Sequence, residues 1–166
     1  MTPAPLGILG PPLRYSSPMR ISISDSFLDA MRALAPADAR RASAFAEKLV
    51  VAPEAAGLHP EIVHDAHDRN VRSFRVTRNM RAIVHIEGER TFLLFVARHD
   101  DAYSWARGHC IECLVNGEEV RVRLTLVSAD GVRAAEPIAD GRACIVETLE
   151  ELRVLFAEYG ILGARS

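Results

Sequence analysis

The spacing of hydrophobic and polar residues predicts a strand and two helices at the start of the folded chain. Apolar and polar residues alternate from Met19 to Ser24, which is typical of a short strand. Ser24 or Asp25 supplies a helix cap, and a helix to about Leu34 is predicted from one apolar face: Phe27, Leu28, Met31 and Leu34. Pro36 suits the first turn of a second helix, predicted to reach about Val50 with an apolar stripe at Ala39, Ala42, Phe45 and Leu49.

Three apolar segments with short connections predict a set of paired strands after a loop over residues 54–70. The strands are expected at about 71–77, 80–86 and 91–98, because their connections have hairpin length. The resulting order, β-α-α-β-β-β, predicts an α+β fold in which two helices pack on one face of a small antiparallel sheet. The other face of that sheet is expected to be open.

The character of the chain changes after Gly108. Strands at 110–115 and 120–127 flank Asn116-Gly117, a strong hairpin signal, and a further strand pair is expected around Asp140-Gly141. Thr148 and Glu151 have capping-box spacing before an apolar helical stripe that ends at Gly160. Three segments are therefore expected: a flexible, proline-rich leader (1–18), the α+β domain (19–107) and a small C-terminal β-hairpin/helix unit (108–166).

Composition fits a globular protein, with 49% hydrophobic and 25% charged residues. No apolar run is long enough to span a bilayer, and three cysteines suit the reducing cytoplasm better than a disulfide framework. Charge is unevenly distributed: residues 69–107 carry eight arginines against four acidic residues, whereas 108–166 carry six against ten. Lys48 is the only lysine, so the chain has no P-loop nucleotide site, and no cofactor is expected.

Arginine recurs at every third position from residue 69 to residue 81, and all five arginines are candidate nucleic-acid ligands: Arg69, Arg72, Arg75, Arg78 and Arg81. Strand side chains alternate between faces, so these five cannot share one surface. If an odd loop or a bulge lies near residues 78–80, Arg75, Arg81 and His85 share the open face. Arg72 then begins the core-side row, and Arg69 and Arg78 lie in loops. The alternative is that these arginines only solubilise the sheet.

Two other groups of residues carry weaker signals. Cys110 and Cys113 have C-x-x-C spacing, but a structural zinc site needs four ligands and Cys144 is the only other thiol. On a strand, residues 110 and 113 also point to opposite faces. No metal site is therefore expected. His64 with Asp65, and His67 with Asp68, indicate hydrogen-bonded loop structure.

Several local motifs resemble the RelE/ParE toxin superfamily. Arg75-Val76 followed by Met80 to Val84 resembles the family's paired strands, and Phe95 to His99 followed by Tyr103 resembles its strand-end histidine and late tyrosine. A narrower branch fits better, the RelE-like domain at the start of some bacterial UvrD-type helicases. The motifs that carry this likeness are Ile23 to Phe27, Gly57-Leu58, Glu61-Ile62, His64, Asn70 to Ser73, Arg81 to Ile83 and His99 to Ala106.

The resemblance implies two activities. RelE-type members are metal-independent endoribonucleases that cut messenger RNA on the ribosome by 2′-hydroxyl attack, whereas ParE-type members inhibit gyrase; both are usually blocked by an antitoxin protein. In a ribonuclease of this kind, Arg75 and Arg81 clamp the scissile phosphate and His99 or Tyr103 transfers protons. Those four residues are the candidate catalytic set.

Two features argue against catalysis. The chain has one lysine, and Asp100 and Asp101 follow His99, where their carboxylates repel a phosphate backbone. In the structural alternative, an aspartate caps the following turn while Tyr103 and Trp105 pack on the sheet. The first hypothesis is therefore a cytoplasmic, non-catalytic module that binds nucleic acid or protein beside a helicase-type partner. The ribonuclease toxin is second and the gyrase inhibitor third. The acidic segment 108–166 is a candidate built-in blocker of the basic one.

Overall fold

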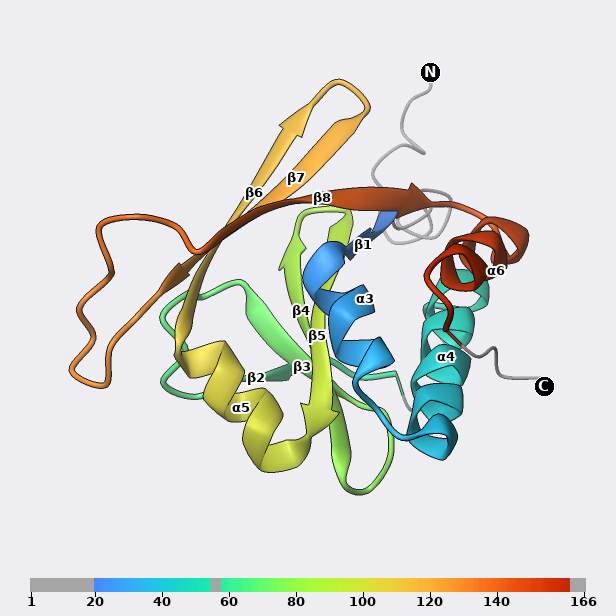
Figure 1. The fold of residues 1–166 in the computed structure, drawn as a ribbon, viewed down its shortest axis with the longest axis horizontal. Coiled ribbons are helices and arrows are strands. Elements are labelled where there is room, and N and C mark those ends of the chain that lie inside the picture. Colours follow the sequence, from blue (N-terminus) through green and yellow to red (C-terminus); the bar gives the residue numbers. More distant parts are fainter. Residues whose placement is uncertain (1–19, 55–57, 162–166) are drawn as a thin grey trace, which may run out of the picture.

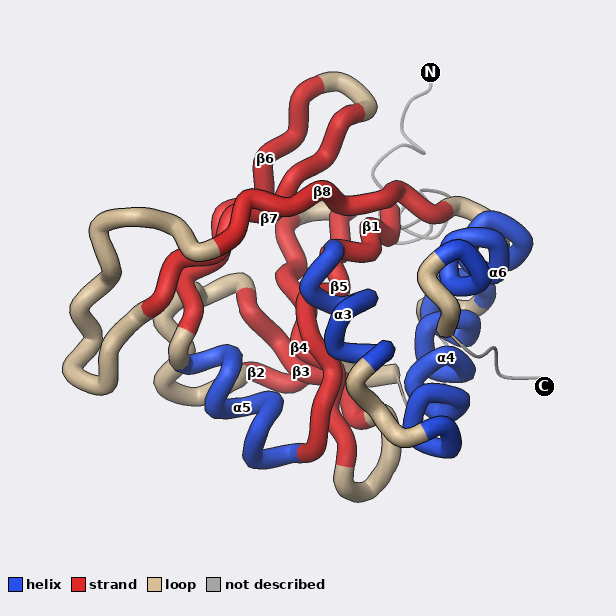
Figure 2. Tube along the Cα trace, in the orientation of Figure 1, coloured by secondary structure: helices blue, strands red, loops and turns tan. Residues whose placement is uncertain are grey.

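The chain folds around one eight-stranded mixed sheet in the computed structural model, which describes residues 20–54 and 58–161. The strand order is β2-β3-β4-β5-β1-β8-β7-β6, and four helices belong to the described residues (Figures 1 and 2). β1 is parallel to β5, whereas the other neighbouring strands are antiparallel. The predicted leader, residues 1–18, lies outside the described residues.

The elements in chain order are β1 (Arg20–Ser24), α3 (Asp25–Arg32), α4 (Pro36–Val51), β2 (Glu61–Ile62), β3 (Val71–Arg75), β4 (Met80–Glu87), β5 (Arg90–Arg98), α5 (His99–Arg107), β6 (His109–Asn116), β7 (Glu119–Leu126), β8 (Ala139–Val146) and α6 (Leu149–Glu158). Short-range signals place most of them correctly. The backbone N–H of Phe27 donates to the Ser24 hydroxyl at the start of α3, and Pro36 occupies the first turn of α4. The predicted Thr148–Glu151 capping box opens α6.

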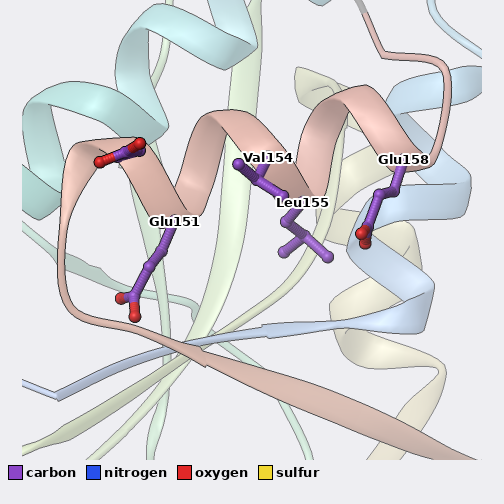
Figure 3. A pocket seen from close by; sticks show the side chains of 5 residues that line it. Glu151, Val154, Leu155 and Glu158 are labelled. Carbon is purple, nitrogen blue, oxygen red and sulfur yellow. The ribbon is translucent and has the colours of Figure 1, made fainter.

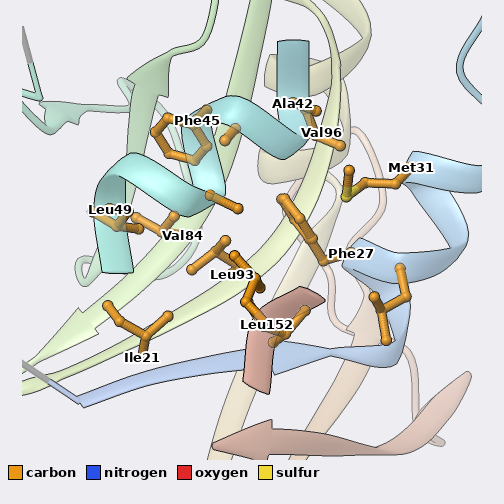
Figure 4. Packing of buried hydrophobic residues seen from close by; sticks show 14 of the residues in the cluster. Ile21, Phe27, Met31, Ala42, Phe45, Leu49, Val84, Leu93, Val96 and Leu152 are labelled. Carbon is orange, nitrogen blue, oxygen red and sulfur yellow. The ribbon is translucent and has the colours of Figure 1, made fainter. Parts of the chain in front are cut away.

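One face of the sheet is covered by α3, α4 and α6, which enclose the first core. The apolar stripes predicted for the first two helices are buried there, with Phe27 and Leu49 almost fully enclosed (Figure 4). Leu152, Leu155 and Phe156 of α6 join the same cluster. The C-terminal helix therefore helps to enclose the core that the N-terminal helices begin.

The opposite face is buried as well, so the expected open face is wrong. α5 contributes Ala102 and Ala106 to a second core, and β6 and β7 supply Ile111, Val120, Val122 and Leu124. The sheet supplies Ile83, Phe92 and Leu94 from the middle of β4 and β5. β4 and β5 therefore carry apolar side chains on both faces. The sheet curls so that β6 and β7 pack across β4 and β5.

The predicted fold class is also wrong. The sheet is neither small nor purely antiparallel, and the last three strands form no separate unit, because β8 pairs with β1 in the middle of the sheet. The strand pair expected around Asp140-Gly141 is instead one strand, β8. Gly141 allows the α3 carboxylate of Asp25 to approach, because a Cβ there would lie 3.1 Å from Asp25 Oδ2. That oxygen accepts the backbone N–H of Arg142.

Candidate nucleic-acid interface

Arg75 and Arg81 lie directly opposite each other on β3 and β4, which confirms that they share a face. The connection between this pair is the odd-length segment 76–80, as the sequence argument required. Arg72 pairs with Val84 and belongs to the other face, also as predicted. His85 shares the face of Arg81 but is only 3% exposed, because the second core covers it; its Nε2 lies 3.4 Å from Asp68 Oδ2.

Arg81 is a structural residue in spite of its charge. Its side chain is buried, and Nη1 donates to the carbonyls of Thr77, Met80 and Arg78 at 2.9, 3.0 and 3.2 Å. These carbonyls lie in the β3–β4 turn and at the first residue of β4, so the guanidinium holds the turn in shape. Nε is buried and has no hydrogen-bond partner, so burial also keeps this guanidinium from bidentate contact with a phosphate.

The other four arginines of the series divide between structural and free positions. Arg72 Nη1 donates to the carbonyls of Arg69 and Val71, so its side chain folds back along its own strand. The side chains of Arg69, Arg75 and Arg78 are exposed and make no hydrogen bond or ion pair with the described part of the chain. Three of the five predicted nucleic-acid ligands are therefore available to a partner.

The His99 motif begins helix α5, which the sequence interpretation missed. Nδ1 of His99 lies 3.0 Å from Asp100 Oδ1, and the His99 ring packs edge-on against Tyr103 with ring centroids 4.4 Å apart. The Tyr103 hydroxyl shares a 3.1 Å hydrogen bond with the hydroxyl of the buried Ser73 on β3. Tyr103 thus fastens α5 to the sheet, as the structural alternative expected. No aspartate caps the helix, whose N-cap is Arg98.

Arg98 is a further exposed cation at this surface that sequence reasoning did not single out. It pairs with Met80 across the β4–β5 ladder, and the backbone N–H of His99 donates to the Asn79 carbonyl at 2.7 Å. The β3–β4 turn and the start of α5 are therefore adjacent, which brings Arg78 and Arg98 to the same end of the sheet. The signal was available: Arg98 directly follows an apolar strand and precedes the His99 motif.

Three rings stack where α5 meets the sheet. Trp105 lies between Phe95 and His109, with centroid separations of 4.8 and 4.2 Å and nearly parallel planes. Burial lowers the pKa of His109, and the hydrogen bond that its Nδ1–H donates to the Trp105 carbonyl raises it to a lesser degree. The imidazole therefore favours its neutral form in the folded protein.

This stack predicts a loss of stability in weak acid. The unfolded state binds the His109 proton more readily, so the contribution of His109 is fully present above its unfolded pKa of about 6.5 and falls as the pH drops below it. We expect the free energy of unfolding, measured in urea at pH 7.5 and 5.5, to fall less in His109→Asn than in wild type. Trp105, the only tryptophan, gives a local fluorescence readout. Equal falls in both proteins would contradict this assignment.

The predicted site residues line none of three surface hollows in the structure. A hollow of about 570 Å³ lies between the loop around Asp65, the end of α5 and residues 127–131, and one of about 280 Å³ separates α3 from β7 and β8. The third, of about 340 Å³, follows α6 and is bordered by Glu150, Glu151 and Glu158 (Figure 3).

The C-x-x-C segment does not bring its two thiols to the same face of β6. Cys110 and Cys113 occupy opposite-facing positions of β6, and burial, together with the nearby carboxylates of Asp68 and Glu87, raises the pKa of Cys113 to about 12. In residues 20–54 and 58–161, no three His, Cys, Asp or Glu side chains are arranged to hold a metal ion. No helix in these ranges has the length and apolar character to cross a bilayer.

Comparisons with protein-family models, curated proteins and solved structures yield no match to this chain.

Proposed function

We propose that the chain is a non-catalytic module that binds single-stranded nucleic acid in the bacterial cytoplasm. The observation that carries the proposal is the division of the arginines: Arg81 is committed to three backbone carbonyls, whereas Arg75 and Arg78 are exposed and unpaired. Arg98 extends the cationic surface from the turn to the start of α5. Guanidinium groups on an open surface bind successive phosphates without requiring a pocket.

Two further features support the setting of this module. Cys110, Cys113 and Cys144 are all free thiols, which suits the reducing cytoplasm. The resemblance of the His99 to Ala106 motif to RelE-like helicase domains supports a helicase-type partner that supplies the single strand. The carboxylates of Asp100 and Asp101, in the first turn of α5, repel phosphates and so limit how closely a phosphate backbone approaches His99.

Salt-dependent binding tests the proposal. With three phosphate contacts, affinity for a labelled single-stranded oligonucleotide is expected to fall about 20-fold between 50 and 200 mM salt, since each contact adds about 0.7 to the slope. The Arg75→Ala/Arg78→Ala variant should bind more weakly, and its affinity should fall by less than about 3-fold between 50 and 200 mM salt. Fluorescence anisotropy measures both.

The matched control removes two arginines whose side chains are each 57% exposed, from the helices over the other face, as Arg32→Ala/Arg41→Ala. It carries the same change in net charge and should keep the wild-type salt slope. Loss of binding in both double variants, or no binding by wild type, would overturn the proposal.

A ribonuclease is the second candidate, favoured by the contact of His99 with both Asp100 and Tyr103 beside the free arginines. A single-stranded RNA oligonucleotide incubated with the protein should remain intact if the module only binds. Cellular messenger RNA should also remain intact after expression of the protein in bacteria. Cleavage that disappears in His99→Ala would establish the ribonuclease instead.

A further inference from the structure

β6 forms one end of the sheet, and its outer edge has no partner strand in the described fold. The β6–β7 hairpin also projects beyond the body of the molecule (Figure 1). The free edge of a strand presents a row of N–H and C=O groups, and the occupant that satisfies such a row is another strand.

The register of the hairpin shows which residues present these groups. Val127 N–H donates to the Gly108 carbonyl at 2.9 Å, and bonding alternates from there along an antiparallel pair. Asn116 and Glu119 flank the two-residue turn, where the flanking pair is hydrogen bonded. Even-numbered residues of β6 therefore bond to β7, while the backbone groups of Ile111, Cys113 and Val115 point outward.

The projecting part of this edge carries apolar side chains on both faces. Leu114 and Val115 are 37% and 43% exposed, and as neighbours on a strand they point to opposite sides. β6 contains none of the lysine or proline residues that commonly block edge pairing. Its one charged residue, Glu112, lies 3.7 Å from Arg123 of β7.

We propose that β6 pairs antiparallel with β6 of a second copy of this chain, with the two-fold axis at Leu114. Leu114 then meets the partner subunit's Leu114, Cys113 meets the partner subunit's Val115, and Glu112 meets the partner subunit's Asn116. Apolar side chains are matched on both faces, and the carboxylate is placed opposite an amide. The outward backbone groups of Cys113 and Val115 gain four hydrogen bonds across the axis.

The two neighbouring registers are less favourable than the one with its axis at Leu114. An axis at Val115 sets Glu112 against the partner subunit's Glu118, a like-charge pair. An axis at Cys113 sets Glu112 against the partner subunit's Leu114 and separates the two leucines. An axis that passes between two residues sets the outward-facing backbone groups of one strand against inward-facing groups of the other. Only an axis through a residue keeps outward-facing groups opposite one another.

Proline at the outward-facing position tests the backbone pairing. Val115→Pro removes an N–H that β7 does not use, so the hairpin should persist while the dimer is lost. Because the contact is small, we expect wild type to dimerise weakly, with a monomer–dimer equilibrium visible by sedimentation velocity at concentrations up to about 1 mM. Leu114→Lys should also be monomeric, whereas the matched Val154→Lys change on α6 should leave the equilibrium unchanged.

Cross-linking tests the register. Leu114→Cys places two Cα atoms about 4.5 Å apart in a non-hydrogen-bonded pair, within disulfide range, so mild oxidation should give a covalent dimer. Glu112→Cys places its two thiols about four residues apart along the strands. Its yield of covalent dimer should therefore not exceed that of wild type. Circular dichroism confirms that each variant is folded. A wild type that stays monomeric, a dimer that survives Val115→Pro, or preferential cross-linking at residue 112 would each overturn the proposal.

Discussion

Truncation after Arg107 is expected to abolish cooperative folding. The shortened chain loses β8, whose residues pair with β1 from Ile21 to Ser24, and thereby exposes one edge of a central strand. It also loses the α6 side chains of the first core and the β6–β7 side chains of the second. Both cores are opened, and the lost burial far exceeds the marginal stability of a domain. Urea unfolding followed by circular dichroism should show no cooperative transition.

A chain truncated after Ile161 is the appropriate control, because it retains α6 and the buried Ile161. It should unfold with the midpoint of the full chain. If the protein truncated after Arg107 still unfolds cooperatively, β6 to α6 are dispensable additions. The idea of 108–166 as a removable blocker then becomes testable by nucleic-acid binding; a truncated chain that does not fold cannot test it.

The second large effect is expected from Arg81→Ala. Removal of the guanidinium takes the Arg81 donor from the carbonyls of Thr77, Arg78 and Met80 and opens a space in a buried region. The free energy of unfolding should fall by about 3 kcal/mol, which corresponds to roughly 6–12 °C in Tm for a chain of this size. Differential scanning calorimetry and urea unfolding measure the change.

Arg75 provides the matched control because it lies directly opposite Arg81 and carries the same charge. Arg75→Ala should change stability by less than about 0.5 kcal/mol, since its side chain is exposed and unpaired. The two variants therefore separate structure from binding. Equal destabilisation, or a stable Arg81→Ala protein, would show that the buried guanidinium does not hold the turn.

Features that depend on neighbouring residues were predictable from the sequence. The Ser24 cap, Pro36 and the Thr148–Glu151 capping box each fix an element through contacts within a few residues. The shared face of Arg75 and Arg81 followed once an odd-length loop was assumed, because strand alternation and loop length decide which side chains face together.

The missed features depend on distant partners or on weak local signals. α5 has no side-chain cap, and its buried face is formed by Ala102 and Ala106, whose small side chains give little apolar periodicity. The burial of Arg81 could not be predicted, because it depends on the direction of backbone carbonyls around the β3–β4 turn. The apolar run from Thr91 to Ala97 did contain a usable signal, because a strand buried on both faces loses its alternation.

The central place of β1 has a consequence for how the chain folds during synthesis. Ile21 is among the first residues that the structure describes, yet its strand partners are Thr91 and Val146. Local hairpins such as β3–β4–β5 can form early, whereas the second edge of β1 stays unpaired until β8 leaves the ribosome. Such long-range pairing makes folding slow and leaves an apolar strand exposed in the meantime. The nascent chain is therefore expected to depend on chaperones until residue 146 has emerged.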